Sequence, residues 1–372
     1  MFHFFEPRHI KEARHVLKGS QKMLHYKRDQ LSEESIAEIE ALMQKLSRAI
    51  SARDAGVIEE IGKKLDGLWS SLMPAASEAG WRENCEVFLV AIVIAIGVRT
   101  YFLQPFTIPT GSMQPTLNGI IGYETNETPP DFFRRLVDFA WLGRTYVNVV
   151  AKNDDRVIAM TERRFLYFFT LTEIRCERDT YRAWTARDTL ARYFHLDATR
   201  EFRAGEVLAR GYVNAGDHVF VDKVSYHFRK PSRGEVFVFK TTNIMPIERQ
   251  LRAQQIEGSQ FYIKRLAGLP GDELRIDPPN LFVNGERAEG FGFARVMAAK
   301  DGYNGYGSGP ERGFLGEPDN PFRLPEHAYF ALGDNSYNSS DSRYWGVVPE
   351  PNLMGRGFFV YWPFTSHWGL IR

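Results

Sequence analysis

Hydrophobic residues recur every three to four positions through the first part of the chain, and this spacing predicts amphipathic helices. Ser32 precedes one such set, with Glu34 and Ser35 in the first turn, as expected at the start of a helix. That set comprises Ile36, Ile39, Leu42, Met43, Leu46 and Ile50. The pattern repeats at Val57, Ile58, Ile61, Leu65, Leu68 and Leu72, and Ile10, Val16 and Leu17 suggest an earlier helix. We expect residues 1–80 to form a helical bundle or hairpin with a solvated charged face.

A strongly apolar run follows, unbroken from Val87 to Val98 and continuing past Arg99 to Leu103. A membrane span needs roughly 20 residues, and the length suffices if Arg99 extends its charge to the interface. The alternative is a buried helix of a soluble protein, but the run has no polar face. It lies too far along the chain for a removable signal peptide. We therefore predict one transmembrane helix over residues 85–104.

Short apolar or alternating runs bounded by turn residues occupy the C-terminal part and predict a mainly antiparallel β domain. These runs are His218 to Asp222, Glu235 to Lys240, Phe261 to Leu266, Asn280 to Val283, Ala328 to Leu332 and Gly357 to Trp362. The expected domain comprises residues 105–117 and 215–372. Residues 118–214 form an insertion between its two parts, and their pattern predicts no particular fold.

Composition narrows the function classes. A chain of 372 residues with 44% hydrophobic content can build a core on each side of a membrane. The net charge of +1 argues against nucleic-acid binding. The two cysteines, Cys85 and Cys176, do not suggest a disulfide framework. No cluster has the spacing of metal ligands and no glycine-rich phosphate loop is evident, so no metal and no cofactor are expected.

Three segments carry candidate chemistry. Ser112 lies in the motif PTGSMQPTL, directly after the apolar run, where a nucleophile would work at a bilayer surface. Lys264 lies in an apolar strand, and burial lowers the pKa of an ammonium group so that it can act as a general base. The loop from Gly333 to Gly346 is rich in hydroxyls and carboxylates that could orient such a base.

Taken together and in order, five blocks resemble the bacterial type I signal peptidases, which are membrane-anchored Ser/Lys endopeptidases. The blocks are PTGSMQPTL, GDHVFVDKVSY, RGEVFVFK, YIKRLAGLPGDEL and GDNSYNSSDSRYWGVVP. The resemblance implies a β-rich catalytic domain of the signal-peptidase type.

The resemblance also implies roles at matched positions. Ser112 would be the nucleophile, Lys264 its general base, and Ser339 the group that orients the lysine amine. The Ser112 backbone N–H and the Thr110 hydroxyl would form the oxyanion hole. A structural charge network would comprise Arg265, Asp334, Asp341 and Arg343. Substrate pockets for small side chains would be lined by Phe106, Ile108, Met113, Val238, Tyr262 and Ile263.

The chain departs from the family pattern at a few places. Thr110 stands where serine is common, and Ser336 stands where arginine is frequent. The 118–214 insertion stands where the simplest members of the resembled family have a connection of only a few residues. Some related peptidases use a histidine as base, but His218 is interpreted here as structural because Lys264 occupies the base position.

The resemblance implies a single-pass protein of the plasma (inner) membrane, with a cytoplasmic N-terminus and an extracytoplasmic catalytic domain. Its partners would be preprotein signal peptides and the lipid bilayer, with no nucleic acid, and a contact with the secretion machinery stays open. Two other readings remain: a self-cleaving Ser/Lys regulatory protease, and an inactive membrane-anchored assembly protein.

Overall fold

The structure is a computed structural model and describes residues 7–72, 76–165, 169–197, 199–309 and 311–372. The chain separates into two compact units, Met1–Val93 and Ile94–Arg372. Each unit is described by itself below.

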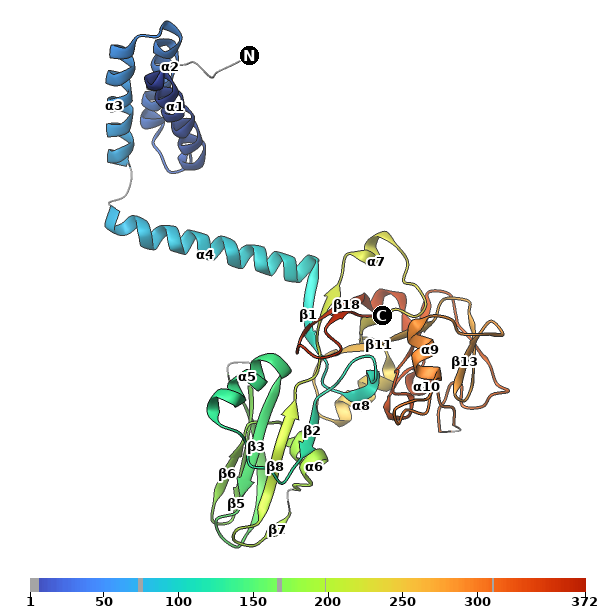
Figure 1. The fold of residues 1–372 in the computed structure, drawn as a ribbon. Helices are drawn as coiled ribbons and strands as arrows, with labels where there is room; N and C mark the ends of the chain where they lie inside the picture. The colour runs from blue at the N-terminus through green and yellow to red at the C-terminus, as the bar shows by residue number, and fades with distance from the viewer. Residues whose placement is uncertain (1–6, 73–75, 166–168, 198, 310) are drawn as a thin grey trace. The chain divides into compact units, whose positions relative to one another are not determined.

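In its described residues the N-terminal unit contains three helices before α4 (Ala76–Tyr101) (Figure 1): α1 (Arg8–Lys27), α2 (Glu33–Ala52) and α3 (Ala55–Leu72). The Ser32 hydroxyl caps α2 by accepting a hydrogen bond from the Ser35 N–H. Most apolar residues of the predicted stripes face inward, and Ile39, Leu46 and Leu65 are fully buried, whereas Val16 and Val57 are exposed. The predicted helical N-terminal region is confirmed.

The next helix, α4 (Ala76–Tyr101), contains the apolar run. Its segment Glu83–Tyr101 is long and apolar enough to cross a membrane, and none of it is buried against the rest of the protein. Among the described residues it is the one helix with this property. A helix whose apolar side chains are exposed on all sides suits a lipid environment better than water. The structure therefore contains a candidate for the transmembrane helix that the sequence predicts.

An antiparallel sheet of eight strands forms the centre of the second unit, in the order β1-β9-β18-β10-β11-β16-β17, with β19 paired to β18. Its strands are β1 (Leu103–Thr107), β9 (His218–Asp222), β10 (Val236–Lys240), β11 (Phe261–Gly268), β16 (Ala328–Leu332), β17 (Val348–Pro349), β18 (Leu353–Trp362) and β19 (Gly369–Leu370). The five predicted runs that fall in this sheet are confirmed as strands. The sheet joins β1, which precedes the insertion, to strands that follow it.

A second, four-stranded antiparallel sheet lies in the orange part of the ribbon in Figure 1, in the order β14-β13-β12-β15. It comprises β12 (Glu273–Asp277), β13 (Asn280–Val283), β14 (Glu286–Arg287) and β15 (Phe322–Arg323). The predicted strand Asn280 to Val283 matches β13. Short helices complete this unit: η1 (Gly111–Met113), α7 (Ser225–Phe228), α8 (Met245–Ala253), α9 (Phe291–Met297), η2 (Ser336–Asn338), α10 (Ser342–Trp345) and η3 (Glu350–Asn352).

The 118–214 insertion contains two further antiparallel sheets, ordered β2-β8-β3 and β6-β5-β4-β7. Its elements are β2 (Ile121–Glu124), α5 (Phe132–Leu142), β3 (Arg144–Val150), β4 (Asp155–Phe165), β5 (Phe169–Cys176), β6 (Thr180–Ala183), α6 (Arg187–Phe194), β7 (Glu201–Phe202) and β8 (Val207–Asn214). They enclose a hydrophobic core of their own, in which Ile174, Leu190 and Leu196 are fully buried. A segment with its own sheets and core is a module in its own right.

Asp217 joins the two ends of this module. Its carboxylate accepts a hydrogen bond from the Asn118 N–H at 2.7 Å, and its own N–H donates to the Asn118 carbonyl at 2.8 Å. The Ile108 N–H donates to the Asp217 carbonyl at 2.9 Å. His367 Nδ1 lies 2.8 Å from the same carboxylate, which is almost fully buried. The chain therefore leaves and re-enters the rest of the second unit at one place.

Candidate active site

Ser112 lies in a tight 3₁₀ turn, η1, at the start of the loop that follows β1. The turn is held because the side chains of Met113 and Leu117 are fully buried in the apolar cluster below it. The Thr116 and Leu117 N–H groups both donate to the Met113 carbonyl at 2.9 Å, which closes the loop. Ser112 is itself largely buried. The loop is therefore a rigid support for its hydroxyl.

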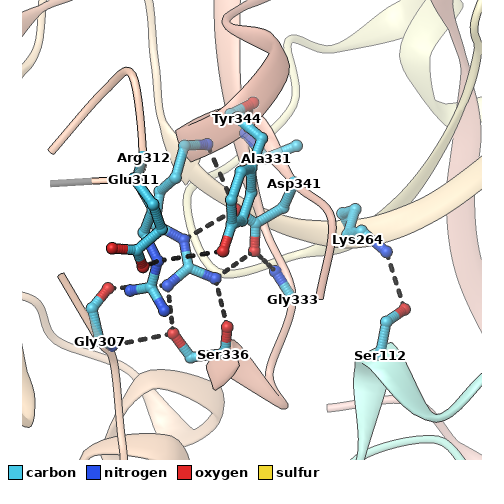
Figure 2. A network of polar contacts seen from close by, with 12 residues as sticks. Ser112, Lys264, Gly307, Glu311, Arg312, Ala331, Gly333, Ser336, Asp341 and Tyr344 are labelled. Atoms are coloured by element: carbon cyan, nitrogen blue, oxygen red, sulfur yellow. Dashed lines mark hydrogen bonds and ion pairs between the residues drawn. The ribbon is translucent and has the colours of Figure 1, made fainter. Parts of the chain in front are cut away.

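Lys264 reaches this hydroxyl from β11, where it lies opposite Phe237 of β10. Its Nζ is 2.7 Å from Ser112 Oγ (Figure 2). Burial lowers the pKa of Lys264 to about 8, while the carboxylates of Asp341 and Asp334 act in the opposite direction. An amine with this pKa is partly neutral near pH 8, so its lone pair can accept the proton of Ser112.

Thr110 and Ser339 flank the pair differently. The Thr110 hydroxyl lies 3.4 Å from Ser112 Oγ, a long contact, and its side chain is open to solvent. Ser339 is buried, and among the described residues its hydroxyl has no hydrogen-bond partner. In this structure it therefore makes no hydrogen bond to the Lys264 amine.

Gly333 separates Ser339 from the nucleophile loop. A Cβ atom at this position would lie 2.1 Å from Ser339 Oγ and 2.7 Å from the Ser112 carbonyl oxygen. Only the absence of a side chain lets the hydroxyl and the carbonyl approach the same backbone so closely. Figure 2 shows Gly333 between the loop carrying Asp341 and the Lys264–Ser112 pair.

Two fully buried ion pairs stiffen the strands and loops around the site. Arg265 pairs with Asp334 at 2.6 Å, and Arg343 pairs with Asp341 at 2.6 Å. The Thr116 hydroxyl donates to the Asp334 carboxylate, which links the first pair to the nucleophile loop. The four charges predicted as a network thus form two separate pairs.

Ser336, at a position where the resemblance implies that arginine is frequent, contacts Arg343 of the second pair. The Arg343 guanidinium donates to Ser336 Oγ at 2.5 Å and to the Ser336 carbonyl at 2.7 Å. The Gly307 N–H donates to the same hydroxyl at 2.9 Å (Figure 2). The small polar side chain therefore acts as an acceptor for a neighbouring arginine.

Most residues expected to line substrate pockets gather in one apolar cluster beside Ser112. Phe106, Ile108, Met113, Val238 and Ile263 belong to it. Tyr262 instead packs in the neighbouring cluster, against Phe239 at 6.1 Å between ring centroids. Within the described residues β1 is the terminal strand of its sheet, so its outer edge has free backbone groups.

His218 is the first residue of β9 and pairs with Thr107 of β1. Its Nδ1 is 3.0 Å from the Gly216 carbonyl oxygen, and its ring packs against Trp362 at 4.7 Å. Burial lowers the pKa of this histidine. No group of three or more potential metal ligands occurs among the described residues.

Sequence reasoning missed several residues that shape the site. The Asn335 N–H donates to the Ser112 carbonyl at 3.1 Å, and its side-chain amide donates to the Gly111 carbonyl at 3.2 Å. Thr116 and Gly333 were also not singled out. Asn335 and Gly333 adjoin Asp334 in the same sequence block, so their place beside a predicted charge was the available signal.

Similarity to known proteins is found in the part of the chain that contains most of the central sheet and Lys264. Residues 209–362 match the model of the family described as signal peptidase, peptidase S26. This range contains Lys264 and Ser339, whereas Ser112 precedes it.

Two relatives illustrate the similarity. The chain is 37% identical over 147 residues to a protein named probable signal peptidase I-2 from Synechocystis, covering 40% of this chain and 56% of that protein. It is 32% identical over 151 residues to a signal peptidase I from Leptolyngbya laminosa, covering 41% of this chain and 63% of the relative. The chain thus spans less than two thirds of these two relatives.

A crystal structure of a signal peptidase I from Enterococcus faecalis also matches, with 26% identity and a TM-score of 0.25, over 34% of this chain and 97% of that one. The apolar helix α4 together with the relatives indicates a membrane-associated protein. The match over residues 209–362 and the relatives agree with the resemblance: this part of the chain is similar to the signal peptidase (peptidase S26) family and to type I signal peptidases.

Proposed function

We propose that this protein is a membrane-anchored serine endopeptidase that removes signal peptides from preproteins, with Ser112 as nucleophile and Lys264 as general base. The observation that carries the proposal is the 2.7 Å contact between Lys264 Nζ and Ser112 Oγ in a buried site. Two residues 152 positions apart meet at hydrogen-bonding distance, and burial has lowered the pKa of the lysine to about 8.

Each step of the proposed reaction uses groups already in place. Neutral Lys264 takes the Ser112 proton while Oγ attacks the carbonyl carbon of the scissile bond. The ammonium then returns this proton to the departing amine, which leaves an ester on Ser112. Lys264, neutral again, takes a proton from water, and the resulting hydroxide equivalent cleaves the ester and restores the free serine.

The oxyanion of each tetrahedral intermediate would be stabilised by the Ser112 N–H and the Thr110 hydroxyl. The Thr110 hydroxyl lies only 3.4 Å from Ser112 Oγ, so it is near the carbon that Oγ attacks. Ser339 would orient the Lys264 amine during the reaction. Its unpartnered hydroxyl is available for such a bond.

The substrate would bind as an extended strand along the free edge of β1, which leads directly into the Ser112 loop. The apolar cluster around Ile108, Met113 and Val238 would receive its small side chains. Signal peptides end in small residues at the cleavage site, and their apolar part lies in the bilayer. Enzyme and substrate would thus meet through shared membrane residence.

In this proposal α4 spans the plasma membrane once, the helices α1–α3 lie in the cytoplasm, and the peptidase lies outside. Ser112 follows Tyr101 by 11 residues, which limits their separation to about 40 Å even for an extended chain. The active site is therefore tethered close to the membrane surface. The signal peptide is the partner proposed for it.

The test is cleavage of a purified preprotein by the detergent-solubilised protein, with the cut located by mass spectrometry. Ser112→Ala and Lys264→Ala should each abolish cleavage, and the double variant should be no worse than either, because the two residues act as a unit. Lys240→Ala is the matched control, since Lys240 lies exposed on the neighbouring strand β10. Cleavage by the Lys264→Ala protein at the wild-type rate would refute the dyad. A cut in this chain alone, with preproteins spared, would favour a self-cleaving protease.

A further inference from the structure

The helix α5 of the insertion presents its apolar side to solvent. At about 100° per residue, positions 132, 133, 136, 137, 140 and 141 fall within an arc of roughly 180°. This arc carries only apolar residues, and Phe133 is 78% and Val137 63% exposed. A surface helix of a soluble domain normally shows the opposite arrangement, with its polar face outward.

The opposite side of α5 is already occupied, so the helix cannot bury the exposed arc by rotating. Asp138 is buried and accepts a hydrogen bond from the Tyr146 hydroxyl at 2.6 Å. Phe139 packs against Trp362 at 5.8 Å between ring centroids. The Trp362 indole N–H donates to the Ala140 carbonyl at 2.8 Å. The apolar arc is therefore a fixed surface.

This surface continues beyond the helix onto the chain that links β18 to β19. Trp141 packs against Phe364 at 4.8 Å, and Phe364 packs against Trp368 at 6.1 Å. The Phe364 N–H donates to the Trp141 carbonyl at 2.9 Å, which joins the loop to the helix. We define the α5 patch as the exposed side chains that form this surface: Phe132, Phe133, Leu136, Val137, Trp141, Phe364 and Trp368. Patches of this kind mark an interaction site.

The nearest apolar phase is the membrane that α4 would span. From Tyr101, at the end of α4, β1 leads to Thr107, which pairs with His218, which pairs in turn with Trp362 beneath α5. Six residues of strand and two strand spacings amount to about 30 Å. The α5 patch is therefore held within a few nanometres of the point where the chain would leave the bilayer.

The charges beside the patch also suit lipid. Arg134 and Arg135 border the arc, whereas Asp138, the acidic residue within α5, is buried. Arginines next to exposed Phe, Leu and Trp are typical of helices that lie in the headgroup region, where a guanidinium meets phosphate. The patch also includes two tryptophans, Trp141 and Trp368, and tryptophan favours the membrane interface.

We propose that α5 lies in the interface of the membrane that α4 spans, with the α5 patch inserted among the outer-leaflet lipids. The insertion then holds the second unit to the membrane at a point separate from the span. This inference rests on the membrane topology proposed above, but it does not depend on the chemistry of the peptidase proposal.

The test uses the full chain reconstituted in vesicles of phosphatidylethanolamine and phosphatidylglycerol, and only the fraction that floats with the vesicles is measured. In a background of Cys85→Ala and Cys176→Ala, Val137→Cys carries an environment-sensitive fluorophore. The matched control is the same label at Arg252→Cys, an exposed position on α8 with 78% side-chain exposure. Quenching is compared for lipids carrying a quencher on the upper acyl chain and for aqueous iodide.

We expect the label at position 137 to be quenched severalfold more by the lipid quencher than the label at position 252, and severalfold less by iodide. Adding Phe132→Ser and Leu136→Ser should reduce the lipid quenching at position 137 by at least about twofold. Equal behaviour of the two labels would overturn the proposal. Protection from iodide without lipid quenching, increasing with protein density in the vesicle, would also overturn it in favour of a second copy of the chain.

Discussion

The guanidinium of Arg265 and the carboxylate of Asp334 form an ion pair in which neither side chain is exposed to solvent, with Nη2 2.6 Å from Oδ2. A second bond runs from Nε to Oδ1 at 2.7 Å, so the pair is bidentate. Arg265 immediately follows Lys264 on β11, and Asp334 opens the loop that carries Ser339. The pair therefore joins the strand of the proposed base to the loop of its proposed orienting residue.

Asp334→Ala should strongly destabilise the second unit, because it leaves a buried guanidinium without its counter-charge. Removing one partner of a buried pair costs about 3 to 5 kcal/mol, and we expect a fall in Tm of roughly 10 °C. Thermal unfolding in detergent measures this. Glu177→Ala is the control, because it removes an exposed pair with Arg156 of 3.0 Å and should change Tm little. Equal shifts for the two variants would contradict the structural role of the buried pair.

Cleavage should rise with pH through the pKa of Lys264, which burial lowers to about 8. Below this pKa the amine is protonated and cannot take the Ser112 proton, so the rate should fall about tenfold per pH unit on the acid side. Above it the rate should level off. Single-turnover cleavage from pH 6 to 10 measures the profile. A rate that decreases from acidic to alkaline pH would indicate a carboxylate mechanism instead.

Thr110 tests the proposed oxyanion hole. Loss of one donor that acts on the transition state costs about 10² to 10³ in rate, or roughly 3 to 4 kcal/mol. We expect Thr110→Val to lose about this much kcat with little change in KM, whereas Thr110→Ser should stay near wild type. Steady-state kinetics with a peptide substrate separates the two constants. Normal turnover by Thr110→Val would make Thr110 a packing residue beside Ser112.

Ser339→Ala should separate activity from stability. Among the described residues the Ser339 hydroxyl is buried without a partner, so its removal takes away a desolvated polar group and should not lower Tm. If the hydroxyl orients Lys264 during the reaction, kcat should nevertheless fall while the rising pH limb persists. Kinetics and thermal unfolding of the same preparation give both quantities. A variant with full activity would leave Ser339 without a role in turnover.

The proposed topology predicts an asymmetric response to protease. Added to intact spheroplasts, a protease should digest the part of the chain beyond Leu103 and spare the N-terminal helices, which the membrane would protect. Immunoblots against the two ends of the chain read out the fragments. Digestion of the N-terminal helices with survival of the β-rich part would reverse the orientation.

Sequence patterns were sufficient where one face of an element is buried. The stripe that includes Ile39 and Leu46 predicts α2, and the runs His218 to Asp222 and Ala328 to Leu332 coincide with β9 and β16. These side chains pack in cores, so burial repeats with the period of the element. The predicted run Gly357 to Trp362 is shorter than β18, because a glycine interrupts the apolar pattern of the first residues of the strand, Leu353 to Arg356.

The insertion could not be predicted because its longest strands are polar on much of their surface. In β4 the segment from Thr161 to Arg164 is exposed, and Ile158, an apolar residue, is 54% exposed. A strand pair held mainly by its backbone ladder has no clean alternation of apolar and polar residues. The core of the module is assembled from strands and α6 far apart in sequence, which no local pattern reveals.

The candidate site was recognised through the resemblance rather than through spacing. Ser112 and Lys264 lie 152 positions apart, and their contact depends on the order of strands in the central sheet. The close approach of Ser339 to Gly333 is likewise a property of the tertiary structure. The sequence shows a glycine at this position but not which side chain lies against it. Asp217 appeared only as part of a strand block, although it joins three segments.

The join between Asn118 and Asp217 has a consequence for how such a chain can arise and change. Because the two backbones hydrogen-bond to each other, a segment of different length between them would leave the connectivity of the rest of the second unit unchanged. The hydrogen-bonded junction fixes the two ends of the inserted module and does not depend on what lies between them. Evolution could thus replace the module inserted beside the nucleophile loop. In an engineered variant, a short turn or a different module could connect Asn118 to Asp217.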